Sequence, residues 1–200
     1  TEELRVARSV RDEMDSVLRD YDMLTNVTGK KLPKRVVELR KIRNQLDAVT
    51  ETNLRNNTSN NNGGGVNYWG GSSWPEFYGC TIMGNSASAE GGGVYLAADA
   101  AGLTMERCVV ANNSSGAWAG GVTVGGNQGT STITNCTIVG NSGAASGVEV
   151  FNGATLVIQN SILWDNTPIN FDDQYGNGFA YYSDIGGGYD GEGNIDADPL

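Results

Sequence analysis

The chain has 200 residues, 29 of them glycine and none of them histidine, and its net charge at pH 7 is −10. Without histidine, the usual zinc sites and the usual nucleophilic triads are excluded. The charge is divided unevenly, because residues 51–200 hold two Lys or Arg against fourteen Asp or Glu. An acidic surface does not favour nucleic acid as a partner, since phosphate binding needs basic clusters.

Two amphipathic helices are predicted before residue 49. Apolar residues at steps of three and four predict a helix over 2–24, and Pro33 is well placed to start a second one over 33–48. We expect residues 1–48 to form a helical hairpin. This hairpin either covers an end of the domain that follows, mediates oligomerisation or belongs to a preceding domain. We favour the first alternative, because open sheet edges are normally protected. No run of 18 apolar residues occurs, so no membrane span is expected.

The sequence from residue 49 onwards is repetitive. The element Gly-Cys-Thr-Ile-Met-Gly-Asn at 79–85 has counterparts at 107–113, 135–141 and 160–166. A fixed interval of this length is typical of stacked supersecondary units. Each repeat predicts three short strands, for example about 93–97, 103–106 and 107–111. Residues two apart on a strand share a face, so the repeat predicts inward columns that begin at Val66, Tyr68, Phe77, Cys80 and Ile82.

The Gly-Gly-Gly-Val and Ile-Val-Gly-Asn elements are similar to the repeats of bacterial polymorphic outer-membrane proteins. The whole pattern, over about residues 50–200, resembles the right-handed parallel β-helix of the pectin-lyase-like superfamily. The resemblance implies a mainly β protein: a right-handed parallel β-helix solenoid of about four to five coils over 49–170. It also implies a secreted or cell-surface bacterial protein. It leaves the activity open, because this fold carries lyases, hydrolases, adhesins and inert stalks.

Two polar columns follow the same interval. Parallel strands lie about 4.8 Å apart, so stacked amides can hydrogen-bond along a ladder. A ligand-binding row is the alternative, and we favour the ladder, which would contain Asn57, Asn85, Asn113, Asn141 and Asn166. The second column is Cys80, Cys108 and Cys136, continued by Ser161. Their odd number and small apolar side chains predict a buried, reduced packing column.

Aromatic residues supply the candidate binding site. Trp69, Trp74 and Trp118 fall outside the inward columns, and exposed tryptophans can stack on sugar rings. We therefore take them as glycan-binding candidates. The alternative is that they cover the first coils or the helical hairpin.

Beyond residue 170 the interval is lost, which predicts an irregular acidic C-terminal cap over 171–200. The alternation of Asp190, Glu192, Asn194 and Asp196 resembles the start of an EF-hand calcium loop. Ile195 stands where that loop needs glycine, so a cap without calcium is favoured and calcium is the alternative.

No catalytic constellation is predicted. Lyases of the superfamily use Arg or Lys beside calcium, but only Arg55 and Arg107 follow residue 43, and they do not converge. The interval places Thr123, and no carboxylate, beside Glu149. Asp172 and Asp173 are consecutive, so on a strand they would point apart.

We therefore expect a non-catalytic secreted or cell-surface module. Its expected work is adhesion, contact with an extracellular glycan, or scaffolding by self-association. The alternative is a fragment of a polysaccharide-active enzyme, either a lyase or a glycoside hydrolase, whose catalytic coils lie outside this fragment or whose carboxylates lie at 172–184.

Overall fold

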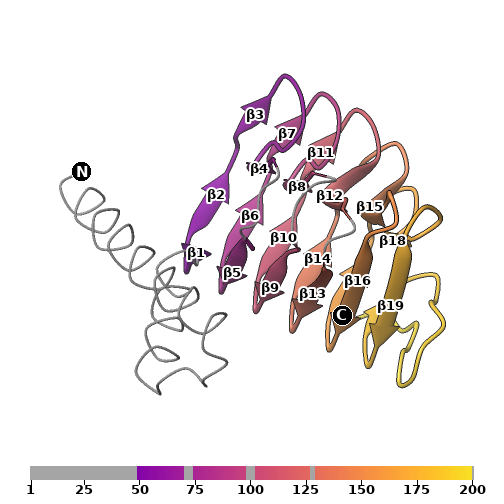
Figure 1. The fold of residues 1–200 in the computed structure, drawn as a ribbon. Helices are drawn as coiled ribbons and strands as arrows, with labels where there is room; N and C mark the ends of the chain where they lie inside the picture. Colours follow the sequence, from indigo (N-terminus) through magenta and orange to yellow (C-terminus); the bar gives the residue numbers. More distant parts are fainter. Residues whose placement is uncertain (1–48, 70–73, 98–101, 127–128, 200) are drawn as a thin grey trace, which may run out of the picture. The chain divides into compact units, whose positions relative to one another are not determined.

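The computed structural model describes residues 49–69, 74–97, 102–126 and 129–199, and the helical hairpin expected over 1–48 lies outside them. Residues 49–200 form one compact unit. In the described part of this unit, the chain winds in successive coils, and each coil is made of short strands, as Figure 1 shows. No helix among the described residues is long and apolar enough to cross a membrane.

The strands of successive coils pair in parallel to form four sheets, named A to D here. Sheet A contains β1 (Val49–Thr50), β5 (Glu76–Tyr78), β9 (Thr104–Glu106), β13 (Thr130–Thr134), β16 (Thr155–Gln159) and β19 (Asn177–Tyr181). Sheet B contains β2 (Asn53–Arg55), β6 (Thr81–Met83), β10 (Val109–Ala111), β14 (Thr137–Val139), β17 (Ile162–Trp164) and β20 (Asp184–Ile185). Sheet C contains β3 (Thr58–Ser59), β7 (Ser86–Ala87) and β11 (Ser114–Ser115). Sheet D contains β4 (Val66–Tyr68), β8 (Val94–Leu96), β12 (Ala119–Val124), β15 (Ser146–Val150) and β18 (Phe171–Asp172).

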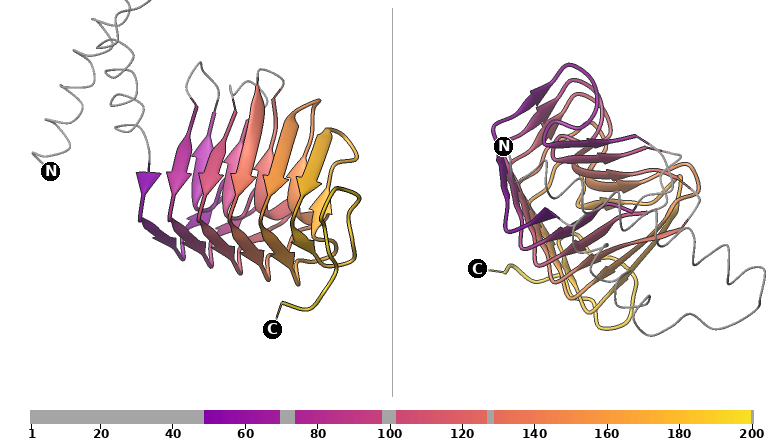
Figure 2. Two further views of the ribbon diagram at one scale, coloured as in Figure 1. Left: turned by 90° about the horizontal axis from the view of Figure 1, so that it is seen from below. Right: turned by 60° about the vertical axis from the view of Figure 1, so that its left-hand side comes forward.

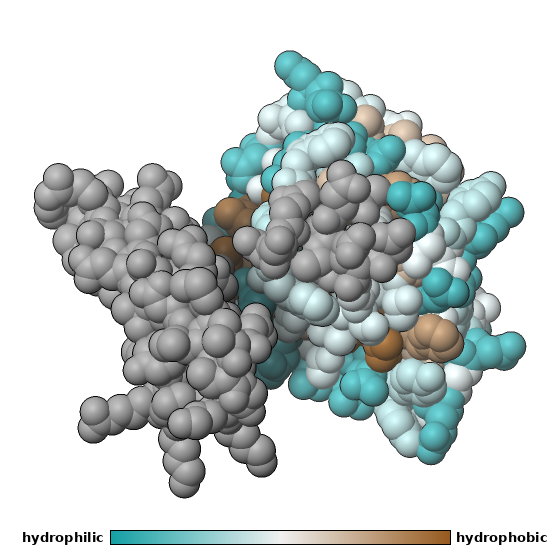
Figure 3. All heavy atoms as spheres, in the orientation of Figure 1, coloured by the Kyte–Doolittle hydropathy of each residue, from teal (hydrophilic) through white to brown (hydrophobic). Residues whose placement is uncertain are grey.

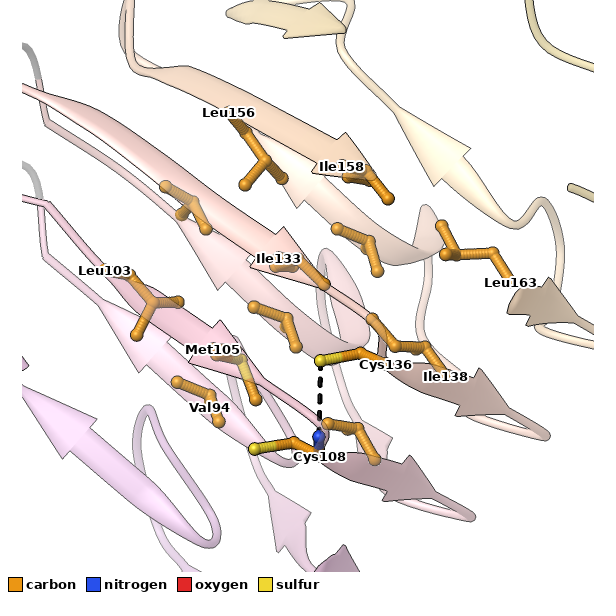
Figure 4. Close-up of a cluster of buried hydrophobic side chains, with 14 of the residues drawn as sticks. Val94, Leu103, Met105, Cys108, Ile133, Cys136, Ile138, Leu156, Ile158 and Leu163 are labelled. Atoms are coloured by element: carbon orange, nitrogen blue, oxygen red, sulfur yellow. Dashed lines mark hydrogen bonds between the residues drawn. The ribbon is translucent and has the colours of Figure 1, made fainter. Parts of the chain in front are cut away.

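The chain visits these sheets in the order A, B, C, D and then begins the next coil, so equivalent residues stack on one another (Figure 2). Ile82, Val110 and Ile138 are register partners in sheet B, and all three are fully buried. The predicted columns therefore face inward and form one continuous core. Figure 4 shows labelled side chains of this core, from Val94 to Leu163, gathered between the sheets.

Because the apolar side chains are gathered inside, the outer surface carries few apolar patches. On the face drawn in Figure 3, the coloured residues are mostly hydrophilic or neutral, and brown is confined to small areas.

Two corners of each coil require a left-handed backbone. The corner between sheets A and B is occupied in successive coils by Glu51, Gly79, Arg107, Asn135, Asn160 and Tyr182, all with positive φ. The corner between sheets B and C is occupied by Asn56, Gly84, Asn112, Gly140 and Asp165, again all with positive φ. Glycine and asparagine tolerate this conformation better than other residues do. The corners therefore explain why Gly and Asn recur within each repeat.

The Gly-Gly-Gly-Val element has a different cause, which is close approach between coils. A Cβ atom on Gly92 would lie 2.3 Å from the carbonyl oxygen of Ser114 in the next coil. Only glycine allows the segment between sheets C and D to pack this tightly.

The asparagine ladder forms along the interior. Asn113 Oδ1 accepts hydrogen bonds from the backbone N–H and from Nδ2 of Asn85, both at 2.9 Å. Asn113 Nδ2 donates in turn to Asn141 Oδ1 and to the carbonyl oxygen of Ile82, both at 2.9 Å. The same pattern repeats from coil to coil and includes Asn57, Asn85, Asn113, Asn141 and Asn166. It ends at Asn170, which the interval did not predict and whose Nδ2 donates to the carbonyl oxygen of Gly186 at 2.7 Å.

The cysteine column is also stacked. Cys80, Cys108 and Cys136 are buried and free. The Cys108 N–H donates to Cys136 Sγ at 3.4 Å, the contact dashed in Figure 4. Ser161 continues the column by accepting from the Cys136 N–H at 3.1 Å, and Ser183 accepts from Ser161 in the same way.

The structure differs from the sequence analysis in two respects. Three of the coils have a fourth strand, because the residues after Asn57, Asn85 and Asn113 pair as sheet C, whereas Ser142 and Thr167 form only isolated bridges there. The solenoid does not end at 170, since β18, β19 and β20 carry sheets D, A and B through to residue 185. This last coil is shorter, with 22 residues between Ser161 and Ser183 against 28 between Cys108 and Cys136. Because this coil is shorter, the repeated sequence element is no longer recognisable in it. Its inward residues still pair in register with those of the preceding coil.

Residues 186–199 cover the last coil. The Tyr189 ring packs against Phe171 with centroids 4.9 Å apart, and its hydroxyl donates to Asp173 Oδ2 at 2.6 Å. Ile195 lies beside β20, where its carbonyl oxygen accepts from the Ile185 N–H at 3.0 Å. This segment therefore protects both the core and the last edge of sheet B.

Candidate functional site

The outer face of sheet D is the most distinctive surface among the described residues. Residues that alternate with its inward valines form one column in register: Asn67, Tyr95, Thr123, Glu149 and Asp172. Outward residues of a solenoid normally meet water, yet Tyr95, Thr123 and Glu149 are only 6%, 0% and 1% exposed.

Side chains from the segment between sheets C and D reach over this column. Glu90 lies close to the side chains of Tyr95 and Trp118, whose donor groups favour its charged form. Asn62, one coil earlier, accepts a hydrogen bond from the Glu90 N–H through its Oδ1 at 3.3 Å. Burial raises the pKa of Glu90, and these two donors act against that rise. Side chains of neighbouring coils therefore lie together over sheet D.

Aromatic rings border the same face. Trp69 lies against Tyr95 with ring centroids 6.0 Å apart, and Trp118 meets the edge of Tyr175 at 6.2 Å. Trp69, Trp118 and Tyr175 are 65%, 40% and 57% exposed, so their rings are open to a ligand. The contacts link five residues, which we call the sheet D strip: Trp69, Tyr95, Glu90, Trp118 and Tyr175.

A pair of carboxylates lies in the column beneath the strip. Glu149 of β15 is the register partner of Asp172 of β18. Neither carboxylate oxygen of Glu149 has a hydrogen-bond partner, and the hydroxyl of Thr123 on its other side has none either. Burial, followed by the charges of Asp172 and Glu90, raises the pKa of Glu149 to about 7. The Ala119 N–H is close enough to oppose this rise but is not in hydrogen-bonding geometry.

The carboxylate pair corrects the sequence analysis. The interval correctly placed Thr123 beside Glu149, but it left Glu149 without an acidic neighbour. Asp172 reaches that position because the last coil returns to sheet D after 23 residues, counted from Val148 to Phe171. Because Phe171 stands where the preceding coils have valine, this shorter step could not be recognised in the sequence. Asp173 points elsewhere and accepts from Tyr189, as expected for consecutive residues.

Of the three tryptophans proposed as glycan-binding residues, Trp69 and Trp118 belong to the sheet D strip. Trp74 lies over sheet A, where its Nε1 donates to Thr104 Oγ1 at 3.0 Å. Tyr175 was not among the predicted residues, and its nearness to Trp118 follows only from the shortened coil. The structure therefore brings two of the predicted rings together with two tyrosines.

The residues of the possible calcium loop point to separate partners. Glu192 accepts from the Tyr182 hydroxyl, and Asp196 Oδ1 accepts from the Gly187 N–H at 3.1 Å. Asn194 Oδ1 accepts from the Ser183 N–H, while its Nδ2 donates to the carbonyl oxygens of Ala180 and Tyr189. Within the described ranges, no three His, Cys, Asp or Glu side chains are grouped as a metal site.

A hollow of about 650 Å³ lies at the C-terminal end of the coils. Of its polar lining residues, Asn166, Asn170 and Asp196 are already hydrogen-bonded within the chain. It therefore offers less to a ligand than the sheet D strip does.

Taken together, the parallel sheets, stacked ladders and left-handed corners define a parallel β-helix. The chain belongs to the family described as right handed beta helix region, whose model matches residues 42–186. No curated protein and no solved structure gives a significant match to the chain.

Proposed function

We propose that this chain is a non-catalytic module of a secreted or cell-surface protein and that it binds an extended glycan along the sheet D strip. The observation that carries the proposal is the exposure of Trp69, Trp118 and Tyr175 beside one face, linked by Tyr95 and Glu90.

The strip has the chemistry that sugars require. Aromatic rings offer flat apolar faces, and Glu90 and Asp172 offer acceptors for hydroxyl groups. Successive coils of a parallel sheet lie about 4.8 Å apart, so the strip follows a regular track on a rigid support. A site that is already formed loses little conformational entropy on binding.

Retention on immobilised polysaccharides tests the proposal. The panel should include neutral, amino-sugar and uronic-acid polymers. By analogy with base stacking, each aromatic ring contributes about 1–3 kcal/mol, which corresponds to a loss of roughly tenfold or more in affinity on removal. We expect Trp69→Ala and Trp118→Ala to show this loss.

Trp74→Ala is the matched control, because Trp74 lies over sheet A. It should bind as the parent chain does. Equal losses in all three variants would contradict a site on sheet D. Self-association in sedimentation, with no retention on any polymer, would select scaffolding over glycan contact.

Polysaccharide cleavage is the second candidate, and the Glu149–Asp172 pair favours it. Glycoside hydrolysis uses two carboxyl groups, and a pKa of about 7 suits a general acid. It ranks second because only Asp172 of the pair is partly exposed, whereas Glu149 is 1% exposed and contacts a ligand only after the side chains over it move. We expect incubation with the same polymers to release neither reducing ends nor unsaturated products. Turnover that disappears in Asp172→Asn would overturn the non-catalytic proposal.

A further inference from the structure

Three oxygen-bearing side chains are stacked on the outer face of sheet D, and two of them have no hydrogen-bond partner in the protein. Thr123, Glu149 and Asp172 are consecutive in the column, one on each of three neighbouring strands. The Thr123 hydroxyl and both Glu149 oxygens are buried and unpartnered. Asp172 is half-buried, and its Oδ1 accepts one hydrogen bond from the Gln174 N–H at 3.0 Å. A buried polar group without a partner costs about 1–3 kcal/mol, and more when charged.

The groups facing Glu149 are all acidic or neutral. Asp172 and Glu90 are the charged groups that act on it, and both disfavour its negative charge. Among the residues that the structure describes, no Lys or Arg acts on it. This described part of the site therefore provides no counter-ion.

We propose that Glu149, Asp172 and Thr123 recognise a protonated amine of the bound glycan, which makes an amino-sugar polymer the ligand class of the sheet D strip. This inference rests on the proposed glycan binding.

The donor and acceptor chemistry favours an ammonium group. An ammonium has three N–H donors and no acceptor, which matches two carboxylates and one hydroxyl oxygen. Hydrogen bonds between an ammonium and a carboxylate are stronger than those between neutral groups. Trp118 and Tyr175 lie on the same face, and aromatic faces attract cations.

A metal ion fits the same residues less well. Calcium takes six to eight oxygen ligands, and the described residues bring no third His, Cys, Asp or Glu to the pair. An ammonium needs only the three acceptors present.

Entry of the amine requires movement of the rings above the column. Trp118 and Tyr175 are 40% and 57% exposed, and they meet edge to face. Exposed side chains change rotamer within picoseconds to nanoseconds. A rotation of these two rings gives the ligand access without any change in the sheets.

Calorimetry with glucosamine hexamer and N-acetylglucosamine hexamer at pH 6 tests the inference, because the two ligands differ only at the amine. We expect the glucosamine hexamer to bind at least tenfold more tightly. Glu149→Gln and Asp172→Asn should each remove most of this preference. Glu76→Gln, on the outer side of sheet A, is the matched control and should retain it.

Proton release supplies a second readout. At pH 6 Glu149 is largely protonated, so an arriving ammonium displaces its proton. Binding should release up to one proton, detected in buffers of different ionisation enthalpy, and Glu149→Gln should release none. A purely structural role for Glu149 would not produce this signal.

Several results would overturn the inference. Equal affinity for the two hexamers, with both lost in Trp118→Ala, would leave the glycan site in place and remove the amine site. Binding of a lysine-rich peptide but of neither hexamer would assign the amine to a protein partner. A requirement for calcium in binding would replace the amine by a metal ion.

Discussion

The environment of Glu149 in the folded chain disfavours the ionisation of its carboxyl group. Its pKa rises from an ordinary 4.5 to about 7 because it is buried and has acidic neighbours. The folded chain therefore holds this proton between pH 4.5 and 7 while the unfolded chain releases it. By linkage, stability is highest below pH 4.5 for this group and falls as the pH rises towards 7.

The pH prediction follows directly. From pH 5 to pH 8 we expect the free energy of unfolding to fall by roughly 2–3 kcal/mol through Glu149. Thermal melts across this range measure it. Glu149→Gln should flatten the dependence, while Glu106→Gln on sheet A should not. A parent chain whose melting temperature rises through this window would contradict the assignment.

The left-handed corners give a second residue-scale prediction. Arg107 has φ of 54° at a corner where the preceding coil has Gly79. A left-handed backbone costs a side-chain-bearing residue about 1–2 kcal/mol, and glycine avoids this cost. After allowing for the greater freedom of glycine in the unfolded chain, Arg107→Gly should raise stability by about 0.5–1 kcal/mol.

Denaturant unfolding of Arg107→Gly measures this gain. Arg55→Gly is the control, because Arg55 lies within β2, where glycine should lower stability by about 0.5–1 kcal/mol. The same sign for both variants would show that the corner carries no strain.

At the scale of elements, the asparagine ladder joins sheets B and C of neighbouring coils. Asn113 is fully buried and bonded on both sides. Asn113→Ala should remove the partner of the Asn85 backbone N–H, of one Asn85 Nδ2 hydrogen and of the Ile82 carbonyl oxygen, and cost about 1–3 kcal/mol. Asn60→Ala, at an exposed position, should change stability by no more than about 0.5 kcal/mol. Equal shifts in melting temperature would show that the ladder is not formed.

The C-terminal cap is held by its own hydrogen bonds. Because Asn194 uses both ends of its amide within the protein, it is not available to an ion. We therefore expect the melting temperature to stay the same, within error, in millimolar calcium and in chelator. A rise with calcium, reversed by chelator, would restore the calcium loop through ligand linkage.

At the scale of the whole molecule, the three thiols report on the integrity of the solenoid. Cys80, Cys108 and Cys136 lie in three successive coils and are buried and free. A thiol reagent should react with none of them in the native chain and with all three after unfolding without reductant. A single reactive thiol in the unfolded chain would show that two of the cysteines form a disulfide.

The regular coils could be predicted from sequence because each inward position is apolar and one of them, in sheet D, is always valine. Val94, Val122 and Val148 mark sheet D so consistently that strand direction and register followed from spacing alone. The last coil could not be predicted, since Phe171 replaces valine after a shorter step. The candidate site depended on that coil. Trp69 and Trp118 were recognisable as aromatic residues outside the core, whereas Tyr175 and the Glu149–Asp172 pair required the three-dimensional register.

The asparagine ladder also gives the molecule a direction. Between successive ladder amides, from Asn57 to Asn170, the donor is always the residue nearer the N-terminus. The second Nδ2 hydrogen donates to a carbonyl oxygen of the preceding coil in Asn85, Asn113, Asn141 and Asn166. The amide dipoles are therefore aligned, and aligned hydrogen bonds polarise and strengthen one another. No single amide can turn over alone, because its neighbours would then face donor to donor and acceptor to acceptor. The side-chain amides are thus locked as one group, which fixes the axial register of each coil independently of the backbone sheets.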